Sequence, residues 1–170
     1  MENLPGISLA VSIEKTSDKK DIAWCAKLMA DNEPWITLQR SYEDSIRLLS
    51  DPISEIYLLQ HNSQPVGFVV IKMKGSFTGY IQILGLTEGI RGQGVGEATI
   101  RYIEELIFRS GPNVFICASS FNLRAQKLYH RLGYETVGIL KDYIIKGHDE
   151  VLMRKTRGPG NDFRQKPANP

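Results

Sequence analysis

The feature that most constrains this chain is a cluster of glycines between a predicted strand and a predicted helix. The strand ends in Leu84-Gly85-Leu86, and the turn after it reads Arg91-Gly92-Gln93-Gly94-Val95-Gly96-Glu97. Apolar residues then recur at helical spacing from Ile100 to Ile107. The first N–H groups of a helix have no partner within it and carry the positive end of the helix dipole, so this turn suits an anion. Glycines leave the main chain open to a phosphate.

The glycines alone leave two interpretations open: a phosphate-binding turn, or a glycine-rich helix start that binds nothing. They do exclude two named motifs. A dinucleotide-binding fingerprint has the spacing G-x-G-x-x-G, whereas Gly92, Gly94 and Gly96 give G-x-G-x-G. A P-loop requires Gly-Lys followed by Ser or Thr, and this turn contains no lysine.

Hydrophobic periodicity around the turn predicts an alternation of strands and helices. The strands are expected at 7–13, 53–60, 65–72, 80–86, 114–118, 134–141 and 150–154, and the helices after the cap at 16–18, at 42–49, after the glycines and at 123–132. The order is β-α-α-β-β-β-α-β-α-β-β, a mixed α/β (α+β) chain. The 170 residues suit a single domain over 1–155, and we expect the Gly- and Pro-rich segment 156–170 to be disordered.

Composition excludes several classes of protein. Lys and Arg number 21 against 19 Asp and Glu, so the net charge of +2 gives no basic surface for nucleic acid. The beginning of the chain does not resemble a secretory signal, and the longest apolar run, 66–71, is too short for a bilayer. Cys25 and Cys117 lie far apart without metal-ligand spacing, so we expect no metal. We therefore expect a cytoplasmic protein without membrane or nucleic-acid partners, as monomer or homodimer.

A second motif lies 26 positions beyond Gly96, in the segment Asn122-Leu123-Arg124-Ala125-Gln126-Lys127-Leu128-Tyr129-His130-Arg131-Leu132-Gly133-Tyr134. It predicts a helix that Asn122 can cap and that Gly133 can end. Tyr129 lies at the edge of the apolar face. From the residues alone, Tyr129 can be an ordinary tyrosine at the edge of the core, and Asn122 only a cap.

Together these two segments resemble the GNAT superfamily of acetyl-CoA-dependent N-acyltransferases. The first is similar to its R/Q-x-x-G-x-G/A motif, and the second to N-x-x-A-x-x-L-Y-x-x-x-G-F/Y. The resemblance implies a mostly antiparallel mixed sheet flanked by helices. The closing stretches Leu140-Lys141-Asp142-Tyr143 and Val151-Leu152-Met153 are similar to members that acetylate protein N-termini, including the bacterial ribosomal-protein alanine acetyltransferase.

The resemblance implies an acetyl-CoA site, with the turn's amides on the pyrophosphate and the strand's main chain on the pantetheine arm. The strand would splay from its neighbour at Gly85, where a bulge, a close approach or a simple bend is possible. Tyr129 would give its proton to the leaving thiolate, a transfer uphill by about 2 kcal/mol between ordinary pKa values. The cofactor-binding residues implied are Leu84, Gly85, Leu86, Arg91, Gly92, Gln93, Gly94, Val95, Gly96, Glu97, Asn122 and Lys127.

The general base is not identified by the resemblance. Some peptide-acetylating relatives carry a glutamate five positions before the motif asparagine, where this chain has Cys117. Candidates are Glu33, Glu88, and His148 or Glu150. We take Glu33 as the catalytic candidate because the break at 32–35 should border the acceptor.

The acceptor site is expected to include Glu33, Trp35 and Tyr143, with Tyr42 beside them. Trp35 can be either an exposed binding aromatic or a buried anchor. Deprotonation at pH 7 costs about 1.4 kcal/mol for an α-amine and about 4.6 for a lysine, which favours a peptide or protein N-terminal α-amine attacking directly in a ternary complex. The alternatives are a small-molecule amine acetyltransferase, a non-catalytic coenzyme A binding or sensing module, and a domain without ligand.

Overall fold

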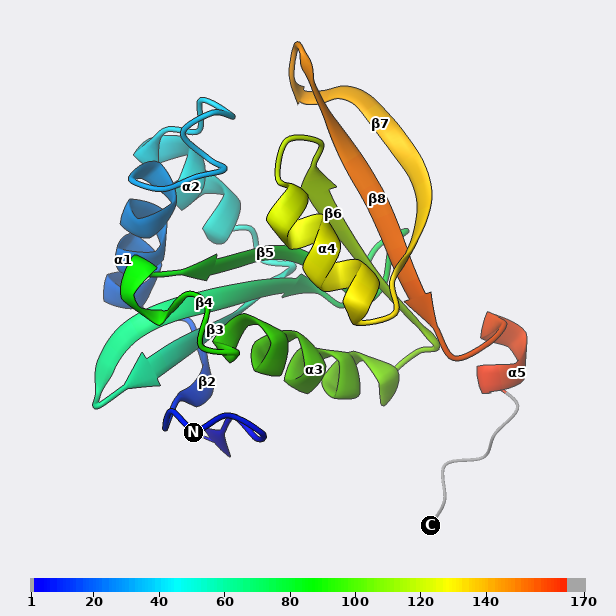
Figure 1. Ribbon diagram of the computed structural model, residues 1–170, viewed down its shortest axis with the longest axis horizontal. Coiled ribbons are helices and arrows are strands. Elements are labelled where there is room, and N and C mark those ends of the chain that lie inside the picture. Colours follow the sequence, from blue (N-terminus) through cyan, green and yellow to red (C-terminus); the bar gives the residue numbers. More distant parts are fainter. Residues whose placement is uncertain (1, 165–170) are drawn as a thin grey trace.

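The computed structural model describes residues 2–164, and its centre is one eight-stranded sheet in the order β1-β2-β3-β4-β5-β6-β8-β7 (Figure 1). Neighbouring strands are antiparallel except β5 and β6, which are parallel. The strands are β1 Glu2–Asn3, β2 Ser12–Thr16, β3 Ser54–His61, β4 Gln64–Lys72, β5 Tyr80–Leu86, β6 Asn113–Ser119, β7 Glu135–Ile145 and β8 His148–Thr156. The helices are α1 Lys19–Ala30, α2 Tyr42–Leu49, the 3-10 helix η1 Glu88–Ile90, α3 Val95–Phe108, α4 Leu123–Arg131 and α5 Gly160–Arg164. The predicted mixed, mostly antiparallel architecture is confirmed.

Local signals explain where several elements begin. Asp18 caps α1 by accepting from the Lys20 N–H at 2.7 Å. Ser41 and Asp44 form a reciprocal capping box at the start of α2. Asn62 and Ser63 both have positive φ in the two-residue turn between β3 and β4, the conformation that matches the twist of a tight hairpin. The strands expected at 53–60 and 65–72 are confirmed, and they pair as this hairpin.

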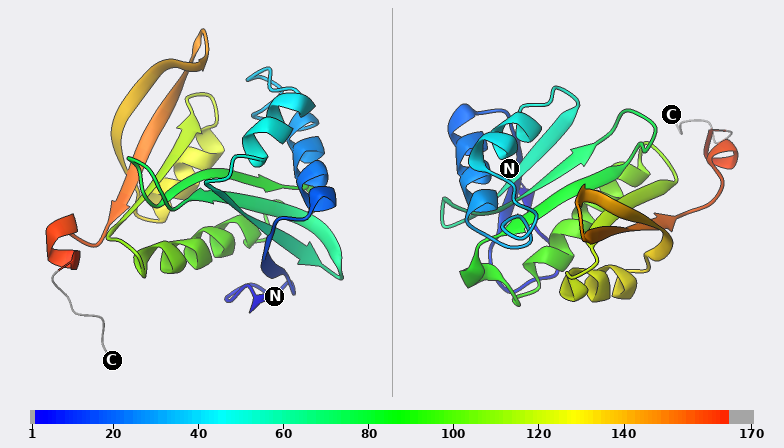
Figure 2. Two further views of the ribbon diagram at one scale, coloured as in Figure 1. Left: turned by 180° about the vertical axis from the view of Figure 1, so that it is seen from behind. Right: turned by 90° about the horizontal axis from the view of Figure 1, so that it is seen from above.

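Alternating side chains of the sheet form two hydrophobic cores, one on each face. Phe68 and Val70 of β4 pack with α1 and α2, whereas Val69 and Ile71 pack with α3. Figure 1 shows α3 on the opposite side of the central strands from the α1–α2 pair. Figure 2 shows that the β7–β8 hairpin rises on the same side of the sheet as α1 and α2. Different elements therefore cover the two faces of the sheet.

Two predictions at the ends of the chain need correction. The strand expected at 7–13 begins instead at Ser12, because Gly6 turns the chain and the Leu4 N–H bonds to the Val11 carbonyl before the ladder with β3 starts. The segment expected to be disordered from 156 contains the last residue of β8 and the five-residue helix α5. The remainder of that prediction, 165–170, lies outside the described residues. No helix within 2–164 is long and apolar enough to cross a membrane.

Candidate active site

The glycine turn begins α3 in a conformation that requires glycine. Gly92 and Gly94 have φ of +84° and +81°, and Gly94 is the N-cap of α3. No side chain within residues 2–164 caps this helix, and the N–H groups of Val95, Gly96 and Glu97 have no protein acceptor there. The turn therefore presents unpaired donors at the positive end of a fourteen-residue helix. A phosphate group fits this arrangement.

A cavity of about 760 Å³ opens in front of these donors. Four segments form it: the α1–α2 connection, β5, the glycine turn and α4. Its lining residues are Glu33, Pro34, Trp35, Thr37, Leu84, Leu86, Arg91, Gly92, Gly94, Gly96, Glu97, Phe121, Asn122, Arg124, Ala125, Leu128, Tyr129 and Arg131. The cavity thus brings together both sequence motifs and the predicted acceptor segment.

The cavity lies where β5 and β6 separate. Their parallel ladder consists of Tyr80↔Phe115 and Ile81↔Ile116, and no pair follows. The register against β4 shifts between Ile81 and Ile83, which makes Gln82 the extra residue of a bulge. The separation begins there, so the prediction that it begins at Gly85 is wrong by several residues.

Gly85 has a different role from a bulge. It lies in regular register opposite Phe68. A Cβ atom at Gly85 would come 2.6 Å from Phe68 Cε1 and 3.2 Å from Trp35 Cη2. Of the alternatives, the close approach is the one observed: two aromatic rings occupy the space beside the main chain.

The α4 motif places a buried phenol beside the cavity. Asn122 Oδ1 accepts from the Ala125 N–H at 3.2 Å, so Asn122 does cap the helix. Tyr129 is only 7% exposed. Burial, and then the nearby Cys117 and Glu150, raise the pKa of Tyr129 well above its usual value. Its hydroxyl therefore stays protonated at neutral pH and can act as a proton donor.

Only some of the side chains predicted to bind cofactor line the cavity. Arg91 donates from Nε to the Leu86 carbonyl at 3.0 Å and from a terminal nitrogen to Asn32 Oδ1 at 3.2 Å, so it ties the turn to β5 and to the α1–α2 connection. Gln93 donates from Nε2 to the Gly89 carbonyl at 2.7 Å. Val95 is buried and Lys127 exposed, and neither lines the cavity. Their contribution to cofactor binding stays a prediction.

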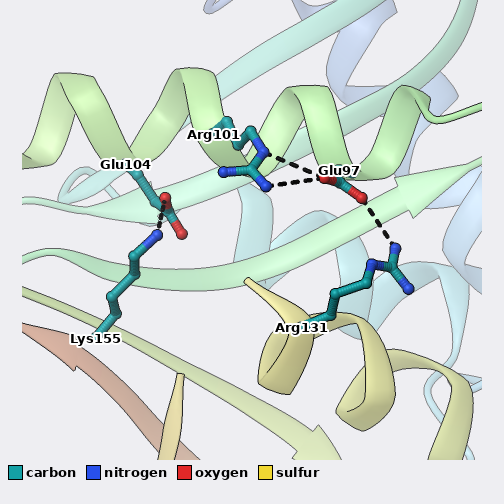
Figure 3. Close-up of polar contacts among 5 residues, drawn as sticks. All are labelled: Glu97, Arg101, Glu104, Arg131 and Lys155. Atoms are coloured by element: carbon teal, nitrogen blue, oxygen red, sulfur yellow. Dashed lines mark hydrogen bonds and ion pairs between the residues drawn. The ribbon is translucent and has the colours of Figure 1, made fainter. Parts of the chain in front are cut away.

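Glu97 is held between two arginines, as Figure 3 shows. Arg131 of α4 contacts one carboxylate oxygen at 2.9 Å and Arg101 the other at 3.0 Å. These guanidinium groups, Arg131 first, lower the pKa of Glu97. The same figure shows Lys155 paired at 2.6 Å with Glu104, which is nearly completely buried. Glu97 can offer only its main-chain N–H to an anion, because its carboxylate is itself negative, and the two arginines balance that charge.

Sequence reasoning missed Arg124 and Arg131, which both line the cavity. The guanidinium of Arg124 lies 3.8 Å from the place a Gly92 Cβ would occupy. The available signal was the spacing of Arg124, Lys127 and Arg131, which puts three cations on neighbouring turns of one helix. Of the three, Arg124 and Arg131 add positive charge to the cavity that contains the unpaired amides.

The predicted acceptor residues do not form one cluster. The Glu33 carboxylate is exposed at the cavity and accepts from the Thr37 N–H at 3.2 Å and its hydroxyl at 3.0 Å. Trp35 is 7% exposed, so it is the buried anchor rather than the exposed aromatic. Tyr143 is 64% exposed on β7 and does not line the cavity. Tyr42, on α2, is also exposed and outside the lining.

A buried polar group lies beyond the gap, on β6 and β8. The Ser119 hydroxyl donates to Glu150 Oε1 at 2.5 Å, and Glu150 is 5% exposed. Burial raises the pKa of Glu150 although the Ser119 bond and Arg40 lower it. Burial also raises the pKa of Cys117, which therefore remains a thiol at neutral pH. Within residues 2–164, no group of His, Cys, Asp and Glu has the arrangement of a metal site.

Comparison with known proteins identifies several relatives. The chain is 32% identical over 111 residues to N-alpha-acetyltransferase MAK3 of Arabidopsis thaliana, with 61% of this chain and 58% of that protein covered. It is 26% identical over 137 residues to N-alpha-acetyltransferase RimI of Mycobacterium tuberculosis, covering 78% and 82%. The chain therefore spans less than two thirds of the length of the Arabidopsis relative.

Solved structures share the fold. An aminoglycoside 6'-N-acetyltransferase complexed with coenzyme A superposes with a TM-score of 0.68 at 15% identity, covering 87% of this chain and 98% of that one. The family model described as the acetyltransferase (GNAT) family matches residues 19–134, a span that includes the α1–α2 connection, the glycine turn and the α4 motif. On this match, the chain belongs to the acetyltransferase (GNAT) family.

Proposed function

We propose that this protein transfers an acetyl group from acetyl-CoA to a primary amine, and that the amine is the N-terminal α-amine of a peptide or protein. The observation that carries the proposal is that the glycine turn, with its unpaired amides, and Tyr129 line one cavity. Family membership supports the reaction class. The two sequence relatives are named as N-alpha-acetyltransferases, which supports the α-amine.

The residues present fit coenzyme A as the acetyl donor. Amides of the glycine turn would hold its diphosphate, with Arg124 and Arg131 beside them. Leu84 and Leu86 line the cavity along the free edge of β5, where main-chain groups can bond the pantetheine arm. When bound, acetyl-CoA supplies an activated thioester. Cys117 would take no part as a nucleophile, because its raised pKa keeps it protonated.

Tyr129 is the proton donor in this proposal. Its buried hydroxyl would protonate the departing sulfur of coenzyme A, and its raised pKa keeps that proton available throughout the neutral range. A lower pKa would ease the transfer but leave less of the acid form. Burial therefore keeps the Tyr129 hydroxyl fully protonated, although it also makes the hydroxyl a weaker acid.

The first prediction tests this role with Tyr129→Phe, which removes only the hydroxyl. We expect kcat to fall by about 100-fold, the lower range for a positioned acid, with the affinity for coenzyme A within about threefold of wild type. Turnover is measured on peptides with a free α-amine, on the same peptides with that amine blocked and one lysine added, and on an aminoglycoside. Binding is measured by calorimetry.

Tyr102→Phe is the matched control, because Tyr102 lies outside the cavity and its hydroxyl donates to Glu2 on the surface. It should leave kcat unchanged. Undiminished turnover of Tyr129→Phe at every pH would remove Tyr129 from the mechanism. Coenzyme A binding by the wild type without acetylation of any amine would favour the non-catalytic module instead, and acetylation of the aminoglycoside alone would favour the small-molecule enzyme.

A further inference from the structure

The Ser119–Glu150 pair lies at the end of the gap between β5 and β6. Ser119 and Glu150 are the final pair of the β6–β8 ladder, three residues beyond Ile116, the last residue of β6 that pairs with β5. From there β6 has no neighbour on its β5 side. A carboxyl group held at this position borders the separation of β5 and β6, behind the residues that line the cavity.

Strand alternation places this carboxyl on the face opposite the cofactor helices. Ile116 and Ala118 of β6 pack in the core that contains α3, so Ser119 points to the other face. Met153 of β8 packs in that same core, and Glu150, three residues earlier, points away from it. Tyr129, by contrast, belongs to the core with α3. The phenol and the carboxyl thus approach the gap from opposite faces of the sheet.

The groups around Glu150 leave its charge unbalanced. Its carboxyl lies close enough to Tyr129 of α4, Cys117 of β6 and Tyr80 of β5 to raise the pKa of each. The charge of Arg40, in the α1–α2 connection, lowers the pKa of Glu150 without an ion pair, and no Lys or Arg within residues 2–164 pairs with it.

The remaining ionisable neighbours have other partners. Tyr143 of β7 contributes to the raised pKa of Tyr80. On β8 itself, the His148 ring packs edge-on against Phe121, with ring centroids 5.0 Å apart, and Asp149 accepts from the Asp142 N–H. A buried carboxylate without a cation is costly, and such groups gather at functional sites.

We propose that Glu150 is the general base, which accepts the proton lost by the acceptor amine directly or through one water, while Ser119 fixes the orientation of the carboxylate. This inference rests on the proposed function. As the carbon–nitrogen bond forms and the carbon–sulfur bond breaks, the amine proton goes to Glu150 and the Tyr129 proton to sulfur. Solvent then removes the proton from Glu150 and restores one to Tyr129, so the products are the amide and the free thiol.

The test compares Glu150→Gln with two other carboxylates. Glu33→Gln removes the rival candidate, and Glu135→Gln removes an exposed carboxylate on β7 outside the cavity. We expect Glu150→Gln to lower kcat by about 100-fold or more, with coenzyme A affinity unchanged by calorimetry. Glu33→Gln should act mainly on the KM of the amine, because Glu33 lines the cavity, and Glu135→Gln should stay within about threefold of wild type. The second prediction is therefore specific to one of three glutamates.

The pH profile separates a base from a structural group. A base must be ionised, so wild-type kcat should fall as the pH drops through the pKa of Glu150, which lies above the ordinary glutamate value. Glu150→Gln should flatten this acidic limb. Ser119→Ala should move the limb to higher pH, because the lost O–H donor stabilised the ionised form, and Ser119→Thr should restore it. NMR of protein labelled at the glutamate carboxyl carbons should show one signal that titrates above the ordinary glutamate pKa, and this signal should be absent from Glu150→Gln.

Three results would overturn the assignment. Glu150→Gln could retain kcat with an unchanged limb, it could raise only the KM of the amine, or the labelled carboxyl could titrate as an ordinary glutamate. Failure of the proposed function looks different: the wild type would then acetylate nothing in the panel, and the assignment would fall with it. An active wild type and an equally active Glu150→Gln refute the base alone.

Discussion

The two sides of the cavity are built by different means. The cofactor side consists of the glycine turn and α4, and its donors toward an anion are mainly main-chain amides. The acceptor side is the α1–α2 connection, which lines the cavity with side chains such as Glu33, and Glu150 of β8 lies behind the lining, bonded to Ser119 at the end of β6. Recognition by the main chain needs closely spaced glycines within one segment, whereas recognition by side chains can use residues that are far apart in the sequence. The acceptor side can therefore change while the cofactor side stays the same.

Trp35 gives the sharpest test of whether the two sides are separable. Its ring is buried with α1, α2 and Phe68 on the acceptor side. We expect Trp35→Ala to lower the free energy of unfolding by about 3 to 5 kcal/mol, measured by chemical denaturation, because it empties a large core volume. Ile36→Ala, at a neighbour that is 52% exposed, should change it by no more than about 0.5 kcal/mol.

Below its unfolding transition, Trp35→Ala should bind coenzyme A as the wild type does. If instead it loses coenzyme A affinity as severely as a substitution in the glycine turn, the two sides act as one unit. The contrast between them would then be wrong.

Gly94→Trp probes the cofactor side in the same way. A side chain at φ +81° is strained, and a Cβ there would already lie 3.2 Å from Ile7 Cγ2. We expect the Kd for coenzyme A to rise by at least about 100-fold, equivalent to 2.7 kcal/mol, in calorimetry. Gly111→Trp is the control, since Gly111 lies outside the cavity with open space beside it and no left-handed φ. Retained affinity in Gly94→Trp would contradict the phosphate assignment.

The smallest expected effect concerns the ion pair between α3 and α4. Arg131 and Glu97 are both partly exposed, and Arg101 keeps Glu97 paired when Arg131 is removed. Arg131→Met should therefore change the free energy of unfolding by less than about 1 kcal/mol, and less at high salt. Arg101→Met is the matched comparison. A loss of several kcal/mol in thermal or chemical unfolding would mean that this surface pair, rather than the packed core, holds the cofactor side together.

The same contrast explains what could be predicted from the sequence. The glycine turn, α4 and β5 follow from contiguous patterns: positive φ at Gly92 and Gly94, and apolar periodicity in the flanking elements. Glu150 was one candidate among several, because only the pairing of β6 with β8 brings it to Ser119. Long-range packing decides that Trp35 is buried rather than exposed. It also decides that the strands begin to separate at Gln82. No local pattern encodes such contacts.

The contact at Gly85 links three positions that are far apart in the chain. Because Phe68 and Trp35 fill the space where a side chain at 85 would extend, even alanine there would collide with a ring. A larger residue at 85 becomes acceptable only together with a smaller one at 68 and a shifted ring at 35. Natural variants of this chain should therefore change these positions jointly, and a library that randomises one of them alone would recover mostly the parental residue.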